Sequence, residues 1–234
     1  MKLRAYAKIN LGLRVFQRQA DSYHRIQGLM QSIGLCDQLV LERFGKGIEL
    51  SVEPPLGIPA EENLAYRAAE LMVETANLTP NLRIQLMKRI PVGAGLGGGS
   101  SDAAAVLVGI NELFNLGMDK AKLLELAAEL GSDPSFFLEG GTCLVAGRGE
   151  RIKRIPPLPE YHLALLIPPF SLSTAAVYRQ FDRLGSDGGE FDEKSPRLLP
   201  FLRNDLERAA LQLRPELGEY RNLLGKASPD FFGM

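Results

Sequence analysis

The chain has 234 residues, of which 45% are hydrophobic and 24% charged, and its formal net charge is −1. This length and composition predict a soluble globular protein with one large domain or two modest ones. A net charge near zero gives no general attraction to nucleic acid or to anionic membranes, so any binding of phosphate has to be local. We therefore expect neither nucleic acid nor a membrane as a partner.

The two cysteines, Cys36 and Cys143, form no C-x-x-C pair, and the chain has too few histidines to complete a zinc cluster with them. The N-terminus has no apolar region typical of a signal peptide. The longest apolar run, residues 163–170, is too short to span a bilayer. We expect a protein of the reducing cytoplasm.

Residues 3–15 alternate between apolar and polar side chains, which predicts a strand with one buried face. The polar face presents Lys8 and Asn10 about 7 Å apart, the rise of two residues along a strand. On the residues alone, an ordinary solvated strand face accounts for this pair.

The segment Asp21-Ser-Tyr-His24 is predicted to be a loop after this strand. Tyr23 could stack on a flat base while His24 forms a hydrogen bond with its edge. The alternative is a turn that packs one aromatic ring against the sheet. Both interpretations stay open at this point.

Residues 37–42 and 48–52 are predicted to form a hairpin, joined by the turn at residues 44–47. Residues 63–76 have the pattern of an amphipathic helix. Asn63, near its start, is either the N-cap of this helix or a contact to a nucleotide.

Five glycines fall within the seven positions from 93 to 99, between a predicted strand at 82–87 and a predicted helix at 103–114. Residues 100–102, Ser-Ser-Asp, are signals for the start of that helix. A strand, a bare glycine loop and a helix start direct several unpaired N–H groups toward one point, where the helix dipole also favours negative charge. The pattern predicts a phosphate-binding loop.

Two other glycine motifs fit less well. Gly93, Gly95 and Gly98 satisfy G-x-G-x-x-G, but a second predicted helix at 120–130 stands where a dinucleotide fold needs a strand. The Walker motif fails because no lysine follows the glycines. A flexible linker is disfavoured because strongly periodic elements flank the loop.

Two charged residues each have two interpretations. Lys88 ends the apolar row of the strand at 82–87, where it either meets nucleotide charge or extends its ammonium to solvent. Asp133 precedes Pro134 and fits the N-cap of a helix, which would explain its residue type without any catalytic role.

The second half is predicted from shorter signals. Residues 140–147 fit a strand that closes the first domain, and residues 161–167 fit a strand that opens the second. Three helices are predicted near 173–183, 204–213 and 215–226. The breaker-rich segment 185–196 is expected to be mobile.

The loop sequence Pro-x-Gly-x-Gly-Leu-Gly-Gly-Gly-Ser-Ser-Asp-Ala-Ala, at 91–104, resembles the nucleotide-binding motif of the GHMP kinase superfamily. These small-molecule kinases hold the phosphates of ATP on such a loop. Further motifs resemble the branch that acts on 4-diphosphocytidyl-2-C-methyl-D-erythritol, in the non-mevalonate isoprenoid pathway. They are Ala7-Lys-Ile-Asn-Leu11 and residues 21–24, 62–69, 130–137 and 204–207. The matches follow the family's order through nearly the whole chain.

The resemblance implies an α+β, two-domain GHMP kinase fold. Residues 1–155 would form the N-terminal ATP-phosphate-binding domain, similar to domain 2 of ribosomal protein S5, and residues 156–234 a ferredoxin-like C-terminal domain. The branch carries a third glycine-rich motif, Gly-x-Ser-Gly-Ser-Gly, and the sequence ends at Phe231-Phe-Gly-Met234 where that motif would start. We therefore expect the C-terminal domain to be incomplete as given.

The resemblance also implies a reaction, the transfer of a phosphoryl group from ATP with Mg²⁺ to the 2-hydroxyl of the cytidine diphosphate substrate. Asp133 would be the general base, and Lys8 would keep it ionised, because a neighbouring positive charge favours a carboxylate. The implied nucleotide contacts are Asn63, Lys88, Pro91, Gly93, Gly95, Leu96, Gly97, Gly98, Gly99, Ser100 and Ser101. The implied substrate contacts are Asn10, Tyr23, His24, Thr174 and Tyr178, with the two tyrosines on either side of the cytosine.

Two alternatives remain. Another GHMP kinase, of the mevalonate or homoserine type, would keep the glycine loop but would not need Tyr23, His24 and Tyr178. A truncated, non-catalytic nucleotide-binding protein would account for the missing third motif.

Overall fold

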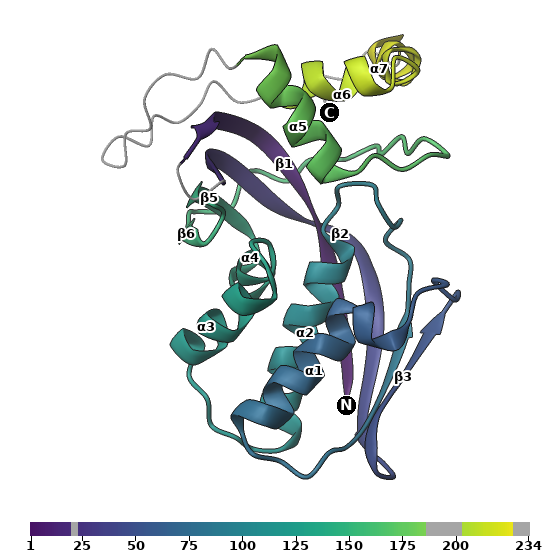
Figure 1. The fold of residues 1–234 in the computed structure, drawn as a ribbon, viewed down its shortest axis with the longest axis vertical. Coiled ribbons are helices and arrows are strands. Elements are labelled where there is room, and N and C mark those ends of the chain that lie inside the picture. Colours follow the sequence, from purple (N-terminus) through teal and green to yellow (C-terminus); the bar gives the residue numbers. More distant parts are fainter. Residues whose placement is uncertain (20–22, 186–202, 227–234) are drawn as a thin grey trace. The chain divides into compact units, whose positions relative to one another are not determined.

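A computed structural model describes residues 1–19, 23–185 and 203–226 (Figure 1). By its internal contacts the chain divides into two compact units. The first unit comprises residues 1–8, 32–92 and 96–140, and the second comprises the described residues of 9–31, 93–95 and 141–226. Two long strands, β1 (Lys2–Arg18) and β2 (His24–Arg43), pair with each other and contribute residues to both units. The predicted domain boundary at residue 155 stays a prediction.

In the first unit, β4 (Asn81–Met87) lies between β2 and β3 (Gly47–Glu53). It pairs antiparallel with β2, where Leu41 is opposite Ile84, and parallel with β3. The predicted hairpin of 37–42 with 48–52 is therefore wrong. Parallel strands need a long crossover, and helix α1 (Leu64–Thr75) provides it between β3 and β4.

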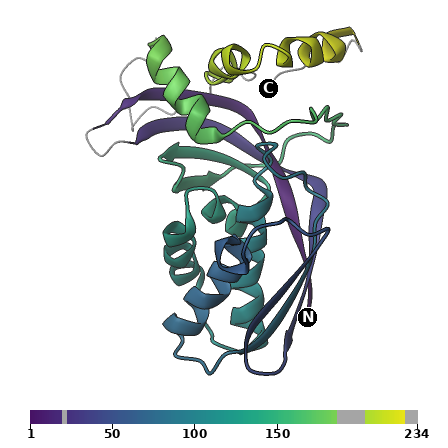
Figure 2. The same cartoon turned by 45° about the vertical axis from the view of Figure 1, so that its right-hand side comes forward.

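Helices α1 and α2 (Gly98–Leu113) lie on one side of these strands (Figures 1 and 2). A short 3₁₀ helix at Ala60–Glu62 precedes α1, and α3 (Lys120–Leu130) and α4 (Pro134–Glu139) follow α2. The core between sheet and helices contains Leu39, Leu41, Leu82, Ile84, Leu86, Ala65, Ala68, Met72, Val106, Leu107, Ile110 and Leu126. Burial of these apolar side chains is what fixes α2, and with it the start of the helix, against the strands.

In the second unit, the first half of β2 pairs with β5 (Thr142–Gly147), which pairs with β6 (Arg151–Arg154). Helices α5 (Thr174–Leu184), α6 (Glu207–Leu213) and α7 (Leu217–Lys226) follow. A smaller core joins Leu13, Val15 and Ile26 of the strands to Val177, Phe181 and Ala209 of α5 and α6.

Two further predictions need correction. Residues 25–36 belong to β2, so His24 begins a strand instead of ending a loop. The predicted strand at 161–167 is wrong, because these residues pair with no strand in the described part of the chain. Their apolar side chains, such as Leu163 and Ile167, are about 40% exposed. An extended segment becomes a stable strand only beside a partner that takes its backbone hydrogen bonds.

In the described part of the chain after residue 154, the named elements are helices, so the strands of a ferredoxin-like domain are not among them. Residues 186–196 of the segment expected to be mobile, and Phe231 to Met234, lie outside the described residues. No helix of the described residues is long and apolar enough to cross a membrane.

Candidate active site

Lys8 is buried in the first unit and is not part of a solvated face, since only 5% of the residue is exposed. Its backbone N–H donates to the carbonyl of Leu96, at 3.0 Å, which ties β1 to the glycine loop. An ammonium is expensive to bury without a counter-charge or hydrogen bonds. Its position therefore needs a partner of opposite charge.

Asp133 supplies that charge, with its Oδ2 4.0 Å from the Nζ of Lys8. It occupies the N-cap position of α4, but its backbone is already helical and its side chain makes no capping hydrogen bond. A normal N-cap residue has extended backbone and accepts from the first turn, as Asp119 does from the N–H of Lys122 in α3. The capping interpretation therefore does not account for the carboxylate of Asp133, which is 37% exposed.

The glycine loop ends at Gly97, the N-cap residue of α2, whose φ is +72°. A Cβ at this position would lie 2.6 Å from the ring of Phe137 and 3.2 Å from the Cγ of Lys8. Both the positive φ and the packing therefore require glycine. Because Gly97 has no side chain to cap α2, the first N–H groups of the helix are left for another acceptor.

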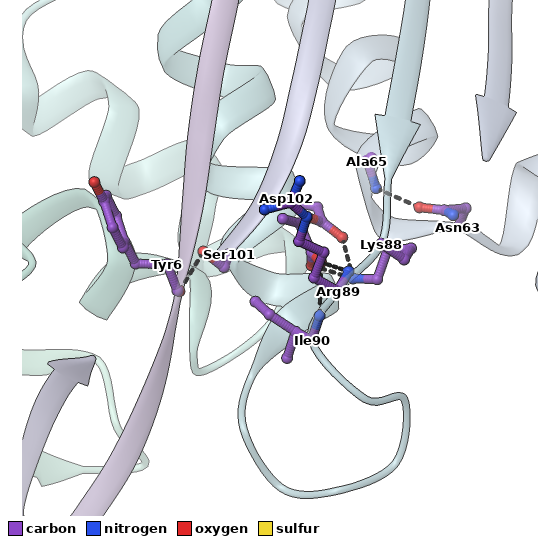
Figure 3. A network of polar contacts seen from close by, with 9 residues as sticks. Tyr6, Asn63, Ala65, Lys88, Arg89, Ile90, Ser101 and Asp102 are labelled. Atoms are coloured by element: carbon purple, nitrogen blue, oxygen red, sulfur yellow. Dashed lines mark hydrogen bonds and ion pairs between the residues drawn. The ribbon is translucent and has the colours of Figure 1, made fainter. Parts of the chain in front are cut away.

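The two loop serines differ in their surroundings. The hydroxyl of Ser101 is buried and donates to the carbonyl of Tyr6, at 2.7 Å (Figure 3). This bond fastens the start of α2 to β1, which also carries Lys8. Ser100 is half-buried. The nucleotide contacts predicted for both serines stay predictions.

Asn63 is the N-cap of α1, because its side-chain oxygen accepts from the N–H of Ala65 at 2.9 Å (Figure 3). The capping interpretation is confirmed, and a nucleotide contact of Asn63 stays a prediction. Lys88 does not extend to solvent, since its side chain is 6% exposed and its ammonium is paired with Asp37 and Asp102. A direct contact of Lys88 with a nucleotide also stays a prediction.

In the second unit, the rings of His24 and Tyr178 lie against each other, with centroids 5.0 Å apart and planes tilted by 35°. The contacts predicted for both residues with a cytosine stay predictions. The Nε2 of His24 lies 2.7 Å from Oδ1 of Asp182, and Phe181 meets the imidazole edge-on. Tyr23 is 55% exposed, and the guanidinium of Arg148 lies over its ring at 4.5 Å. Of these rings, that of Tyr23 is exposed enough for a flat base to stack on it.

The other predicted substrate residues in this unit are Asn10 and Thr174. The side-chain oxygen of Asn10 is buried and has no hydrogen-bond partner among the described residues. A buried acceptor without a partner is costly, so a donor from a ligand would be favoured there. Thr174 is exposed at the first position of α5.

Sequence reasoning missed three acidic residues that contact predicted site residues. Asp182 contacts His24, and Asp37 and Asp102 both pair with Lys88. Asp182 lies one helical turn after Tyr178, so the period of α5 could have placed it on the same face. Asp37 was assigned only to a strand and Asp102 only to a helix start. Nothing in their spacing along the chain indicates that both meet Lys88, since these contacts join separate elements.

Comparison with known proteins adds an independent observation. The family model of the GHMP kinase N-terminal domain matches residues 63–141. Two relatives are each named 4-diphosphocytidyl-2-C-methyl-D-erythritol kinase. The relative from Pelotomaculum thermopropionicum is 44% identical, and the match covers 95% of this chain and 81% of the relative. The relative from Moorella thermoacetica is 40% identical, and the match covers 100% of this chain and 90% of the relative.

A crystal structure of 4-(cytidine 5'-diphospho)-2C-methyl-D-erythritol kinase superposes with a TM-score of 0.74 at 39% identity, covering 95% of this chain and 81% of that chain. The GHMP kinase fold expected from the sequence is therefore confirmed.

Proposed function

Because this chain belongs to the family of 4-diphosphocytidyl-2-C-methyl-D-erythritol kinases, we propose that it transfers the γ-phosphoryl group of ATP to the 2-hydroxyl of that cytidine diphosphate. The observation that carries the proposal is the Lys8–Asp133 pair beside the uncapped start of α2. The Cγ of Lys8 would contact a Cβ at Gly97, and its ammonium is 4.0 Å from the Asp133 carboxylate. A base, a cation and a set of N–H donors are what phosphoryl transfer requires.

Asp133 is the general base of the proposed reaction. Its carboxylate is partly exposed, so a substrate hydroxyl can reach it, and it makes no capping bond that would have to break first. Lys8 places positive charge 4.0 Å from this carboxylate, where the transferring phosphoryl group gains negative charge. At 4.0 Å the pair is too long for a hydrogen bond, and such contacts often tighten once substrate is bound.

The start of α2 holds the phosphates of ATP. Its first N–H groups lack a capping side chain and lie at the positive end of the helix dipole. Magnesium bound to ATP neutralises part of the phosphate charge during transfer. Among the described residues no group of three His, Cys, Asp or Glu side chains is assembled to hold a metal ion.

The second unit supplies the recognition of cytosine. Tyr178 and Tyr23 offer aromatic faces to the base, and His24 and the unpartnered oxygen of Asn10 offer polar contacts. Thr174 is a further substrate contact in this proposal. The reaction belongs to the non-mevalonate route to isoprenoid precursors, in the cytoplasm.

A panel of acceptors tests the proposed function. Initial rates with ATP are measured for 4-diphosphocytidyl-2-C-methyl-D-erythritol, mevalonate and homoserine. We expect kcat/KM to be highest for the cytidine diphosphate by at least about 10⁴, the scale at which buried polar groups reject an analogue that lacks their partners. A higher value for mevalonate or homoserine would replace this function by another GHMP kinase activity. Binding of ATP without turnover of any acceptor would favour a non-catalytic nucleotide-binding protein.

A further inference from the structure

Three charged side chains meet inside the first unit, from three different elements. The ammonium of Lys88, which follows β4, donates to Asp37 of β2 at 2.5 Å and to Asp102 of α2 at 2.7 Å (Figure 3). Asp37 is 0% and Asp102 1% exposed, and the Lys88 side chain is 6% exposed. We call these three residues the loop-base cluster.

The loop-base cluster holds the chain on both sides of the glycine loop. Oδ1 of Asp37 accepts from the backbone N–H groups of Arg89, at 2.5 Å, and Ile90, at 2.8 Å, the last residues before the loop. Asp102 is the fifth residue of α2, the helix that leaves the loop. Lys88 connects the two carboxylates, so the entry and the exit of the loop are joined through one ammonium group.

Close packing makes this connection sensitive to position. A Cβ at Gly98, the first residue of α2, would lie 3.1 Å from the Nζ of Lys88 and 3.0 Å from a methyl carbon of Ile90. The start of α2 therefore rests directly on the cluster. A shift of the ammonium by a few tenths of an ångström would therefore move the first N–H groups of the helix.

The charges of the cluster are not explained by stability. With both carboxylates ionised, the three residues carry one excess negative charge in the interior. Within the described parts of the chain, Oδ1 of Asp102 is buried without a hydrogen-bond partner. Well-packed apolar residues in place of a buried ion pair are often neutral or stabilising. What apolar residues cannot provide is the directional bonding to the backbone of Arg89 and Ile90 and to α2.

A direct contact of Lys88 with the nucleotide is the competing role. An ammonium has three N–H donors, and two of those of Lys88 are used by carboxylates. To reach a nucleotide, the Lys88 side chain, which is 6% exposed, would have to move toward solvent. That movement would break its charge-assisted hydrogen bonds to the two carboxylates. The observed geometry needs no such rearrangement if Lys88 acts through the loop.

We infer that the loop-base cluster of Asp37, Lys88 and Asp102 positions the glycine loop, so that the N–H groups at the start of α2 are preorganised to accept the phosphates of the nucleotide. This inference rests on the proposed function, because it takes ATP as the ligand of the loop. Asp102 is the positioning residue that is easiest to test, since it connects α2 to Lys88 and does not bond to the loop backbone in the structure.

The experiment compares ATP with adenosine, which has no phosphates for the loop to hold. The main variant is Asp102→Leu, which fills the volume and leaves Asp37 and Lys88 as a neutral pair. We expect it to weaken binding of a non-hydrolysable ATP analogue roughly tenfold or more by calorimetry, a change of at least 1.4 kcal/mol, with adenosine affinity unchanged. Asp102→Asn keeps an oxygen that accepts from Lys88 and should restore most of the ATP affinity.

A matched control lies farther along the same helix. The side chain of Asn111 makes two hydrogen bonds with the backbone of Met118. Asn111→Ala should lower the melting temperature and leave the ratio of ATP to adenosine affinity unchanged. If Asp102→Leu fails to fold, Asp102→Ala gives the same comparison.

The outcomes separate the inference from the proposed function. Equal losses for ATP and adenosine, no loss in Asp102→Leu, or an equally weak Asp102→Asn would each overturn the positioning role while ATP still binds the unaltered protein. If the unaltered protein binds no ATP, the proposed function fails and the inference fails with it.

Discussion

At the scale of single residues, the carboxylate of Asp133 could either cap α4 or act as a general base. Its surroundings favour the base, because it lies 4.0 Å from the ammonium of Lys8. Asp133 stands where a cap would stand, yet its side chain takes no hydrogen bond from α4. Asp119, at the start of α3, does accept one. The two aspartates therefore form a matched pair, one suited to chemistry and the other to capping.

Replacing Asp133 by Asn should lower kcat by at least about 100-fold, the usual scale for a lost general base, with ATP affinity nearly unchanged. Asp133→Ala should cost little stability, whereas Asp119→Ala should cost about 1 kcal/mol with turnover retained. Steady-state kinetics and thermal melts of the variants check this. If Asp133→Asn retains turnover and Asp133→Ala loses stability, the role of Asp133 is to cap α4 and not to act as a base.

Lys8→Met should also lower kcat, because it removes the cation beside the base. The double variant with Asp133→Asn should be little slower than the slower single variant, since groups that act as a unit are strongly non-additive. The ratio of the four kcat values measures this coupling. Losses that multiply in the double variant would show that Lys8 acts independently of Asp133.

Asp102 makes stability depend on pH in a direction that can be predicted. Burial raises the pKa of its carboxyl from 3.8 to about 7, although the charge of Lys88 opposes the shift. Since the folded pKa lies above the unfolded value, the stabilising contribution is complete below pH 4 and is lost as the pH rises toward 7. Asp102→Asn should therefore melt at a higher temperature than the unaltered protein at pH 8, and at about the same temperature at pH 4. A lower melting temperature of Asp102→Asn at pH 8 would mean that the ionised carboxylate stabilises the fold.

At the scale of elements, the sequence predicted those helices and strands whose caps and apolar periodicity lie within the segment itself. Helix α3 runs over Lys120–Leu130 as its period indicates, because Asp119 caps it and apolar residues recur on one face. Strand β4 likewise matches its alternation, which the register with β2 preserves. The Lys8–Asp133 pair followed only from the family resemblance, because the residues alone fit a solvated face and a cap.

The failures all concern pairing between distant segments. Alternation predicts a strand at 48–52 but not that β4 would separate it from β2. The residues at 161–167 have strand propensity, yet they form no regular structure, because no strand lies beside them within the ranges that the structure describes. Charges that meet across elements, such as Asp37 and Lys88, leave no periodic signal in the sequence.

Helix α5 places Tyr178 and Asp182 on one face against His24. Tyr178→Ala should weaken the cytidine substrate by roughly 1 to 3 kcal/mol, the scale of base stacking on an aromatic ring, with ATP affinity unchanged. Gln180, whose side chain bonds to Gln212, offers a control on the same helix, and Gln180→Ala should change neither affinity. Calorimetric titration of both ligands decides the point. Equal losses for ATP and the cytidine substrate in Tyr178→Ala would indicate general destabilisation of the fold.

At the scale of the whole molecule, the two units carry different parts of the proposed chemistry. The first contains Lys8, Asp133 and the start of α2, which suit phosphoryl transfer, and the second contains His24 and Tyr178, which suit a base. Since β1 and β2 contribute residues to both units, neither unit is formed from one continuous stretch of the chain. We expect activity to depend on residues of both.

The most direct test of the central claim is the identity of the product. The 234-residue chain is incubated with magnesium, ATP and 4-diphosphocytidyl-2-C-methyl-D-erythritol, and the product is examined by mass spectrometry and by phosphorus NMR. We predict one added phosphate, bonded to the 2-hydroxyl, and at least about 100-fold less of this product from Asp133→Asn within the same time. A phosphate on any other hydroxyl, or release of phosphate to water alone, would contradict the proposed function.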